Sequence, residues 1–325
     1  MNPNRTRKIL IDTDTASDDA VALIMALRSP KVSVLAITVV AGNVSVEQGT
    51  RNALCTAELC DSTVPVFTGA ASPLTRPLED ASWFHGQDGL GDHGYQPTTR
   101  AAEHDFAVDA MVRIIKANPG IELITLGPLT NLALALRESP NLAANVSRCV
   151  VMGGAPCCEG NVTPAAEYNF WVDPEAARVV LRSQLPIELV GWQLSRGAAV
   201  VNGQEIENIL ALQTKFAEFA IRSNDTAARA YRTQTGEEGV ALPDPTAMAI
   251  LLDPVLSLIS SNHYVDVQVD SNITRGMSVV DRLNVAHDAR NRAAWSEVLE
   301  RGRKHTVIWE MDIPGWKQSL LQALR

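Results

Sequence analysis

The chain has 325 residues, of which 46% are hydrophobic and 20% charged, an ordinary balance for a globular protein with a large buried core. Its net charge of -9 and its pI of about 5.2 come without any run of Lys or Arg, so we expect no nucleic-acid or membrane partner. No apolar stretch reaches the roughly 18 residues that a membrane span needs, and the opening residues MNPNRTRK lack the apolar region of a secretory signal.

The first predicted element is a short apolar strand at residues 9–11, and acidic residues follow it at once. These are Asp12, Asp14, Asp18 and Asp19. An apolar helical pattern then covers residues 20–27. Acidic residues therefore gather at the carboxyl end of a buried strand and in the first turn of a helix, which is where open α/β sheets bind their ligands.

The later elements alternate between strand-like and helix-like patterns. Strands are predicted at residues 32–43, 64–68, 121–126, 146–152, 187–190, 263–269, 278–281 and 306–310. Helices are predicted at residues 46–59, 105–118, 129–138, 173–183, 204–232, 243–252 and 316–324. A long loop rich in Pro and Gly spans residues 69–104, and long loops in compact domains are often functional. The alternation predicts an α/β fold with a mostly parallel central sheet flanked by helices, formed by one domain over residues 1–325.

The acidic stretch has three possible interpretations. Capping of the helix with solvated charge needs fewer acids than are present. An EF-hand loop that began at Asp12 would need Gly at its sixth position and Glu at its twelfth, where the chain has Ser17 and Leu23. A metal site on the strand end remains, because hard oxygen ligands at this density suit Ca²⁺ or Mg²⁺.

The acidic stretch and four later motifs resemble the nucleoside hydrolase family. The stretch is also similar, more weakly, to the nucleophile loop of haloacid-dehalogenase-type phosphatases, but no phosphatase-type Lys and acidic motif follows at matching positions. The later motifs are Gly42-Asn43, His85-Gly86-x-x-Gly89-Leu90-Gly91, Leu126-Gly127-Pro128-Leu129-Thr130-Asn131, and Met152-Gly153-Gly154 with Gly160-Asn161 through Glu167-Tyr168-Asn169 and Asp173-Pro174-Glu175. Each motif alone is weak, but their shared order and spacing over residues 8–253 make the set specific.

The resemblance implies a Rossmann-like nucleoside hydrolase fold, a bound Ca²⁺ ion and hydrolysis of the N-glycosidic bond of ribonucleosides. Its implied metal ligands are Asp14, Asp19, the backbone carbonyl of Leu126 and Asp244. Its implied substrate-binding residues are Asp18, Asn43, His85, Asn161, Glu167 and Asn169. Asp14 is the implied general base that takes a proton from a metal-bound water, and Asp12 is an implied supporting acid. A nucleoside substrate, purine or pyrimidine salvage and a homo-oligomer, a dimer or a tetramer, follow from the same likeness.

Several of these residues also have plainer explanations. Asn131 is expected to cap or brace the helix after Leu126 rather than to bind a ligand. Asn161 and Asn169 are compatible with turns, and Glu167 with a surface ion pair. Asp173-Pro174 is typical of a helix start, with Asp as N-cap and Pro at the first helical position. Asp244-Pro245 has the same pattern. His85 either lines the base pocket or orders its loop.

The chain departs from the family pattern at Pro243. Many relatives have there a His that protonates the departing base, and proline cannot donate a proton. His85, Trp83, Trp192 and Tyr231 are the candidates around the base, although each aromatic ring also suits core packing. The departure keeps open an alternative function, that of a ribose- or nucleoside-binding protein that kept the metal site but lost hydrolysis.

The cysteines favour a reducing compartment. Their number is odd, no CxxC pair occurs, and Cys157 and Cys158 are adjacent, which disfavours a bridge between them. We therefore expect a reduced, cytoplasmic protein.

Overall fold

Eight strands form one sheet that is parallel except at one edge. The computed structural model describes residues 6–95 and 99–325. Two short segments lie outside the described part: residues 1–5, which belong to the opening sequence MNPNRTRK, and residues 96–98 of the long loop. The strand order is β3-β2-β1-β4-β5-β6-β10-β7, and only β7 runs antiparallel to its neighbour. The strands of this sheet are β1 (Arg7–Thr13), β2 (Val32–Val39), β3 (Val66–Thr68), β4 (Ile121–Thr125), β5 (Val146–Met152), β6 (Ile187–Val190), β7 (Ser257–His263) and β10 (His305–Met311).

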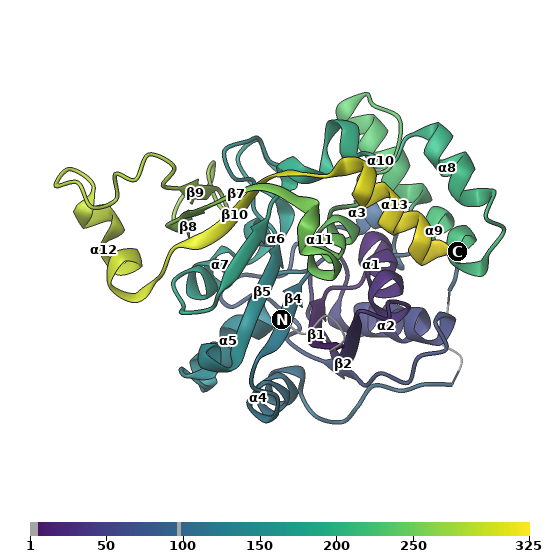
Figure 1. Cartoon of the computed structure of the whole chain (residues 1–325), viewed down its shortest axis with the longest axis horizontal. Helices are drawn as coiled ribbons and strands as arrows, with labels where there is room; N and C mark the ends of the chain where they lie inside the picture. Colours follow the sequence, from purple (N-terminus) through teal and green to yellow (C-terminus); the bar gives the residue numbers. More distant parts are fainter. Residues whose placement is uncertain (1–5, 96–98) are drawn as a thin grey trace.

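Helices cover both faces of the sheet (Figure 1). The helices are α1 (Ser17–Leu27), α2 (Val46–Leu59), α3 (Ser82–His85), α4 (Ala107–Ala117), α5 (Thr130–Glu138), α6 (Tyr168–Val172), α7 (Pro174–Leu181), α8 (Gly203–Leu210), α9 (Lys215–Ser223), α10 (Asp225–Thr235), α11 (Pro243–Leu252), α12 (Arg292–Arg301) and α13 (Ile313–Leu324). One core cluster joins the sheet to α1, α2, α9, α11 and α13, and the other joins it to α4, α5 and α7. Successive residues of β1 alternate between the clusters, with Ile9 and Ile11 in the first and Leu10 in the second, as the two-residue period of a strand requires.

The order of the strands determines where a ligand can bind. Chain connections leave β1 in opposite directions, because β2 pairs with one of its edges and β4 with the other. Such a switch point opens a crevice outside the carboxyl ends of the two strands. The acidic stretch that follows β1 lies at this crevice.

Most predicted elements are confirmed, and the differences lie mainly in the last third of the chain. The predicted helix at residues 46–59 is α2 to the residue, and the proline-led helix at residues 243–252 is α11. The strand β7 was not predicted, because its residues are mostly polar and exposed. The short α3 and α6 and the charged α12 were missed as well, since none of them has a long apolar stripe.

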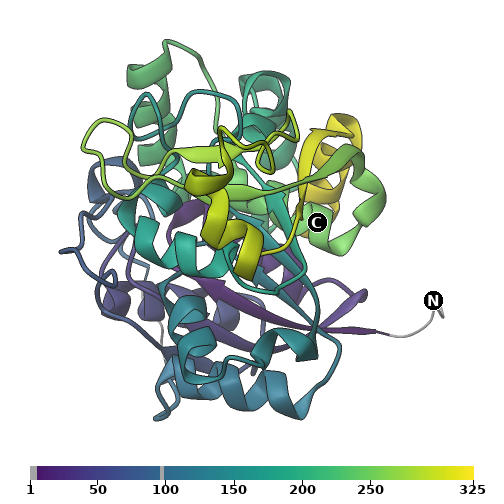
Figure 2. The same ribbon diagram turned by 90° about the vertical axis from the view of Figure 1, so that its left-hand side faces the viewer.

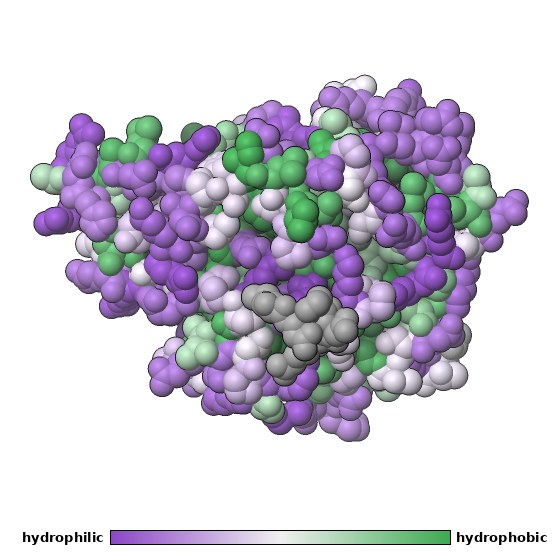
Figure 3. Space-filling view, viewed as in Figure 1, coloured by the Kyte–Doolittle hydropathy of each residue, from purple (hydrophilic) through white to green (hydrophobic). Residues whose placement is uncertain are grey.

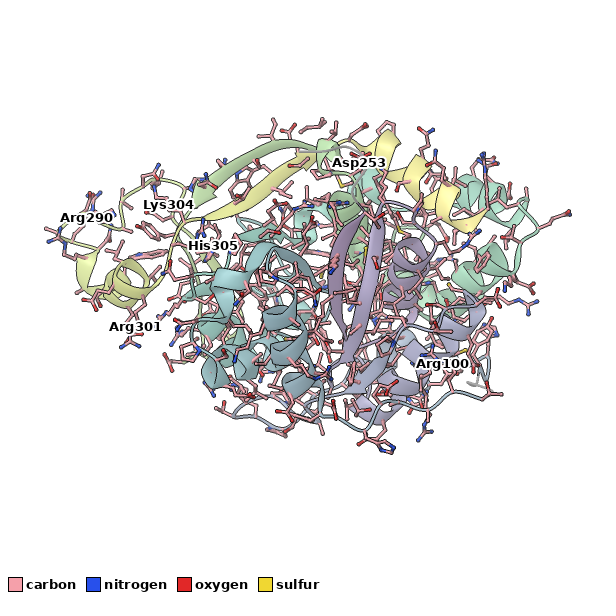
Figure 4. The ribbon with its side chains drawn as sticks, turned by 60° about the horizontal axis from the view of Figure 1, so that its bottom comes forward. Arg100, Asp253, Arg290, Arg301, Lys304 and His305 are labelled. Atoms are coloured by element: carbon pink, nitrogen blue, oxygen red, sulfur yellow. The ribbon has the colours of Figure 1, made fainter. Side chains whose placement is uncertain are left out.

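Residues between β7 and β10 form an arm beside the main sheet. It carries α12 and a small antiparallel sheet of β8 (Val265–Val267) and β9 (Ser278–Val280), and it faces the viewer in Figure 2. The labelled side chains of Arg290, Arg301 and Lys304 lie along this arm (Figure 4). The surface seen in Figure 3 is largely hydrophilic, with apolar residues gathered near β7. No helix within the two described ranges is long and apolar enough to cross a bilayer.

Candidate active site

Four buried carboxylates meet at the carboxyl edge of the sheet. Asp14 follows the last residue of β1, Asp18 and Asp19 lie in the first turn of α1, and Asp244 is the second residue of α11. Their exposed fractions are between 0 and 6%. Two helix N-termini therefore direct the positive ends of their dipoles at the cluster, but no Lys or Arg forms an ion pair with these acids in the described part of the chain.

Asp19 is the most firmly held of the four. The hydroxyl of Thr13 donates to its Oδ1 at 2.6 Å. The backbone N–H of Ala16 and the side-chain amide of Asn43 donate to its Oδ2 at 3.0 and 3.3 Å. Asn43 thus lies beside the carboxylates.

Asp14 is held between two glycines. Its Oδ2 accepts a hydrogen bond of 2.7 Å from the backbone N–H of Asn43. A Cβ atom at Gly42 would lie 2.1 Å from Asp14 Oδ2, and one at Gly127 would lie 2.6 Å from Oδ1. Both glycines occur in motifs quoted above, but the sequence did not reveal that they make room for this carboxylate.

We expect Gly127→Ala to lower turnover about 10²-fold or more, because the new methyl group displaces Asp14 and a shift of about 1 Å can cost that factor. The matched control is Gly203→Ala, since a Cβ at that glycine meets nothing within 4 Å. Steady-state kinetics of both variants check the expectation. Wild-type turnover of Gly127→Ala would show that the position of Asp14 is unimportant.

The carboxylates have oxygen atoms that lack partners. Asp14 Oδ1, Asp18 Oδ1 and Asp244 Oδ1 are buried without a hydrogen bond in the described residues. Burial raises the pKa of Asp14 and of Asp244 well above the usual value, and nearby carboxylates raise both further. Burial, followed by repulsion from Asp19, raises the pKa of Asp18 to about 7. Unpaired buried charges are costly, so the site fits a divalent cation with a preference for oxygen ligands.

The geometry groups the acids slightly differently from the resemblance. Oxygen atoms of Asp18, Asp19 and Asp244 lie within 4.8 Å of one another and could hold an ion. Asp19 and Asp244 belong to the implied ligand set as well, whereas Asp18 was assigned to the substrate and Asp14 to the metal. The carbonyl oxygen of Leu126, also an implied ligand, accepts a hydrogen bond of 2.7 Å from Asn169 Nδ2.

Two of the four acids, Asp18 and Asp244, line a cavity of about 930 Å³, whereas Asp14 and Asp19 lie outside its lining. Of the residues assigned to the substrate, all line this cavity, namely Asp18, Asn43, His85, Asn161, Glu167 and Asn169. Leu126 and Asp244 line it too. The cavity is large enough for a small organic ligand.

Glu167 is an N-cap rather than a surface residue. Its Oε1 accepts from the backbone N–H of Asn169 at 2.9 Å, and its Oε2 accepts from that of Gly154 at 2.7 Å. It is 2% exposed, and burial raises its pKa to about 7. The surface ion pair considered for Glu167 is therefore wrong. Asn161 supports the same turn by accepting at 2.9 Å from the backbone N–H of Tyr168.

Aromatic residues line another part of the cavity. His85, Trp83, Trp192 and Tyr231 all belong to its wall. His85 also orders its loop, because its Nδ1 lies 2.8 Å from the hydroxyl of Ser17 and so connects the loop to α1. Burial lowers the pKa of His85 to about 3, which keeps its ring neutral. Trp192 and Tyr231 pack in a small hydrophobic cluster of their own as well.

Several polar residues of the cavity have no recognisable motif in the sequence. Arg196 and Glu159 form an ion pair, and both line the cavity together with Gln234 and Glu237. The hydroxyl of Tyr231 donates to Glu237 Oε2 at 2.6 Å. These residues lie in charged segments of ordinary composition, and nothing in that composition indicates a ligand-binding site.

Buried hydrogen bonds connect the segments next to the acidic cluster. Asp12 Oδ1 accepts from the hydroxyl of Thr38 at 2.6 Å and from Asn131 Nδ2 at 2.9 Å. Asn131 Oδ1 accepts from the backbone N–H of Ala70 at 2.9 Å. Asn131 therefore braces neighbouring segments, as expected. Asp173 caps α7 by accepting from the backbone N–H of Ala176 at 3.0 Å, with Pro174 at the first helical position.

Comparison with known proteins gives consistent matches over nearly the whole chain. A family model described as inosine-uridine preferring nucleoside hydrolase matches residues 9–318. The pyrimidine-specific ribonucleoside hydrolase RihA of Escherichia coli is 34% identical over 90% of this chain and 94% of that protein. The non-specific ribonucleoside hydrolase RihC of Salmonella enteritidis is 39% identical over 84% of this chain and 87% of its own. The solved structure of a plant nucleoside hydrolase, the PpNRh1 enzyme, has a TM-score of 0.91 at 31% identity and covers 98% of this chain and 99% of that one.

Proposed function

The chain belongs to the inosine-uridine preferring nucleoside hydrolase family and is an N-glycosyl hydrolase that converts ribonucleosides to free base and ribose; we propose that Asp14 is the general base of this reaction. One observation carries the proposal. Asp14, whose Oδ1 is buried without a partner, is grouped with three further acids, and two of these, Asp18 and Asp244, line a cavity that Asn and Glu side chains also line. A polyol needs such partners, because its buried hydroxyl groups must all be hydrogen-bonded.

We further propose that the cation is Ca²⁺. Asp14, Asp19, Asp244 and the carbonyl of Leu126 would hold it, with Asp18 directed at the ribose hydroxyls. A bound divalent cation supplies positive charge that orients hydroxyl groups and makes water more acidic. The all-oxygen donor set and the unpartnered oxygens support this choice.

The protein's own groups perform three tasks in the proposed mechanism. Asp14 Oδ1 takes the proton of the attacking water, while the N–H of Asn43 keeps the other oxygen in place. As the bond to the base breaks, positive charge builds on the ribosyl ring, and the buried carboxylates of Asp18 and Glu167 stabilise that charge. Asn161 and Asn169 bind the ribose hydroxyls.

The chain has no histidine at position 243 to protonate the departing base, so we propose that Tyr231 binds the base without protonating it. Pro243 lines the cavity but has no proton to give. The proton of Tyr231 is committed to Glu237 at 2.6 Å, and burial together with this carboxylate raises the pKa of Tyr231 to about 12. The phenol oxygen therefore offers its lone pairs to the cavity and accepts an N–H of the base.

We expect Tyr231→Phe to raise KM by about threefold to tenfold, with a smaller change in kcat, because the variant loses one neutral hydrogen bond to the base. Steady-state kinetics with the preferred nucleoside measure both constants. A kcat lowered by 10² or more at unchanged KM would instead identify Tyr231 as the proton donor.

The test of the proposed function is a reducing-sugar assay on a panel of purine and pyrimidine ribonucleosides, with Ca²⁺ and again after EDTA. We expect ribose release that stops on chelation and returns with Ca²⁺. Release that persists in EDTA would contradict the cation. Tight binding of ribose or nucleoside without release would favour the binding protein that Pro243 leaves open.

We propose that the protein is a homo-oligomer, a dimer or a tetramer, that acts in cytoplasmic nucleoside salvage. The five cysteines are all free in the structure, which supports a reducing compartment.

A further inference from the structure

Helix α11 contributes one acid to the site, and its other residues are almost all apolar. Its sequence is PDPTAMAILL, and Asp244 and Thr246 are its only polar side chains. The hydroxyl of Thr246 bonds within the helix to the carbonyl of Leu242. Every residue from Asp244 to Leu252 is buried, and the helix packs against α1 and α13.

Two arginines hold the opposite end of this helix. Arg7, on β1, donates to the carbonyls of Leu251 and Leu252, each at 2.9 Å. Arg148, on β5, donates to the carbonyls of Ile250 at 3.1 Å and Leu251 at 3.0 Å. The last-turn carbonyls of a helix lack partners within the helix, and here guanidinium groups fill that need.

Two glutamates on adjacent strands fix the arginines in turn. Glu122 on β4 pairs with Arg7 at 2.8 Å and lies 3.6 Å from Arg148. Glu188 on β6 pairs with Arg148 at 2.6 Å. The side chains of Arg148 and Glu122 are only 11% and 12% exposed, so solvent screens this network weakly. The four strands β1, β4, β5 and β6 thus hold the guanidinium groups in one orientation.

We propose that Arg7 and Arg148 are positioning residues that set the height of α11 along its axis and so place Asp244 at the cation site. Apolar contacts are non-directional, so they define the axial position of a buried helix less sharply than directional hydrogen bonds do. Hydrogen bonds from a planar guanidinium are directional. This inference rests on the proposed role of Asp244 as a cation ligand.

Helix α11 links the amino ends of the parallel strands to their carboxyl ends. Arg7 is the first residue of β1, whereas Asp14 follows its last residue. The ten residues of α11 span about 15 Å between the arginines and the acids. Asp253, labelled in Figure 4, directly follows the arginine-held end of the helix. Since Ca²⁺–oxygen distances fall between about 2.3 and 2.6 Å, an axial shift of a fraction of a turn removes Asp244 from the ion.

The test measures Ca²⁺ affinity by calorimetry on EDTA-treated full-length protein. Arg148→Lys and Arg7→Lys keep the charge beside the glutamates but lack the fork that binds two carbonyls. We expect each variant to weaken Ca²⁺ binding at least tenfold and to need correspondingly more Ca²⁺ for turnover, with kcat restored at saturating Ca²⁺.

The matched control is Arg76→Lys. Arg76 pairs with both oxygens of Glu175 and donates to the carbonyl of Val269 at 2.9 Å, but it touches no part of α11. This variant is expected to lower the thermal midpoint in EDTA without changing Ca²⁺ affinity by more than about twofold. Wild-type Ca²⁺ affinity in folded Arg148→Lys and Arg7→Lys would overturn the inference alone. A wild-type protein that releases ribose but binds no Ca²⁺ would overturn the inference together with the proposed cation, while the hydrolase activity would stand.

Discussion

Replacing Asp14 by Asn is expected to lower kcat about 10⁴-fold, which leaves ribose release near the detection limit. Asn has nearly the volume of Asp and can still accept the N–H of Asn43, whose bond to Asp14 is 2.7 Å. It cannot accept the proton of the attacking water, and general-base catalysis contributes about 10²–10⁴. Loss of one implied cation ligand adds to the effect. The measurement is single-turnover ribose release at saturating Ca²⁺.

The control for Asp14→Asn is Asp225→Asn. Asp225 lies far along the chain on α10 and forms an exposed pair with His93 at 3.1 Å, so we expect unchanged kinetics. Circular dichroism of both variants checks that they fold. Turnover of Asp14→Asn within tenfold of the wild type would rule out Asp14 as the general base.

Asp244→Asn is expected to make the cation-free protein more stable while it removes activity. Burial and the charges of Asp18 and Asp19 raise the pKa of Asp244 well above its usual value, so the ionised form destabilises the fold. An acid whose pKa is higher in the folded than in the unfolded state loses stability as pH rises. The neutral amide should therefore add about 1–3 kcal/mol to the free energy of unfolding at pH 8 in EDTA, with a smaller gain near pH 4.

Urea unfolding in EDTA at both pH values measures this stability, and the reducing-sugar assay measures the loss of turnover, which we expect to be about 10³-fold at ambient Ca²⁺. Asp253→Asn is the control, because this residue forms an exposed pair with Lys31 just beyond α11. If Asp244→Asn destabilises the EDTA-treated protein at pH 8, the acids do not repel one another as the structure indicates.

The sequence predicted the central elements because their residues are buried on both sides. Strand β1 contains an apolar run at residues 9–11 and strand β5 an apolar run at residues 149–152, and such runs are typical of parallel sheets covered by helices. The edge strand β7 has no such run, since six of its seven residues are partly or fully exposed and its antiparallel pairing with β10 supplies its order. Only the tertiary structure reveals such a strand. That the whole chain is one domain stays a prediction.

The site was predictable to a different degree. Short motifs identified the acids and the Asn and Glu residues of the cavity, because each motif ends a strand or begins a helix. Contacts between motifs were not predictable, and the glycines that enclose Asp14 or the N-cap role of Glu167 depend on them. Arg7 and Arg148 could not be found at all, because a single arginine in a strand has no distinctive spacing. The assigned roles of the site residues stay predictions until the variants are measured.

The placement of the acids on α1 and α11 has a consequence for the chain as a polymer. The first of these helices follows the first strand, and the second lies in the last third of the chain. A cation bound by both would close a loop through most of the polypeptide, and the entropy of such a closure grows only with the logarithm of loop length. The five cysteines are free, so no disulfide closes such a loop. A bound cation would close it as a reversible cross-link. The resistance of the fold to unfolding would then follow the free cation concentration around it.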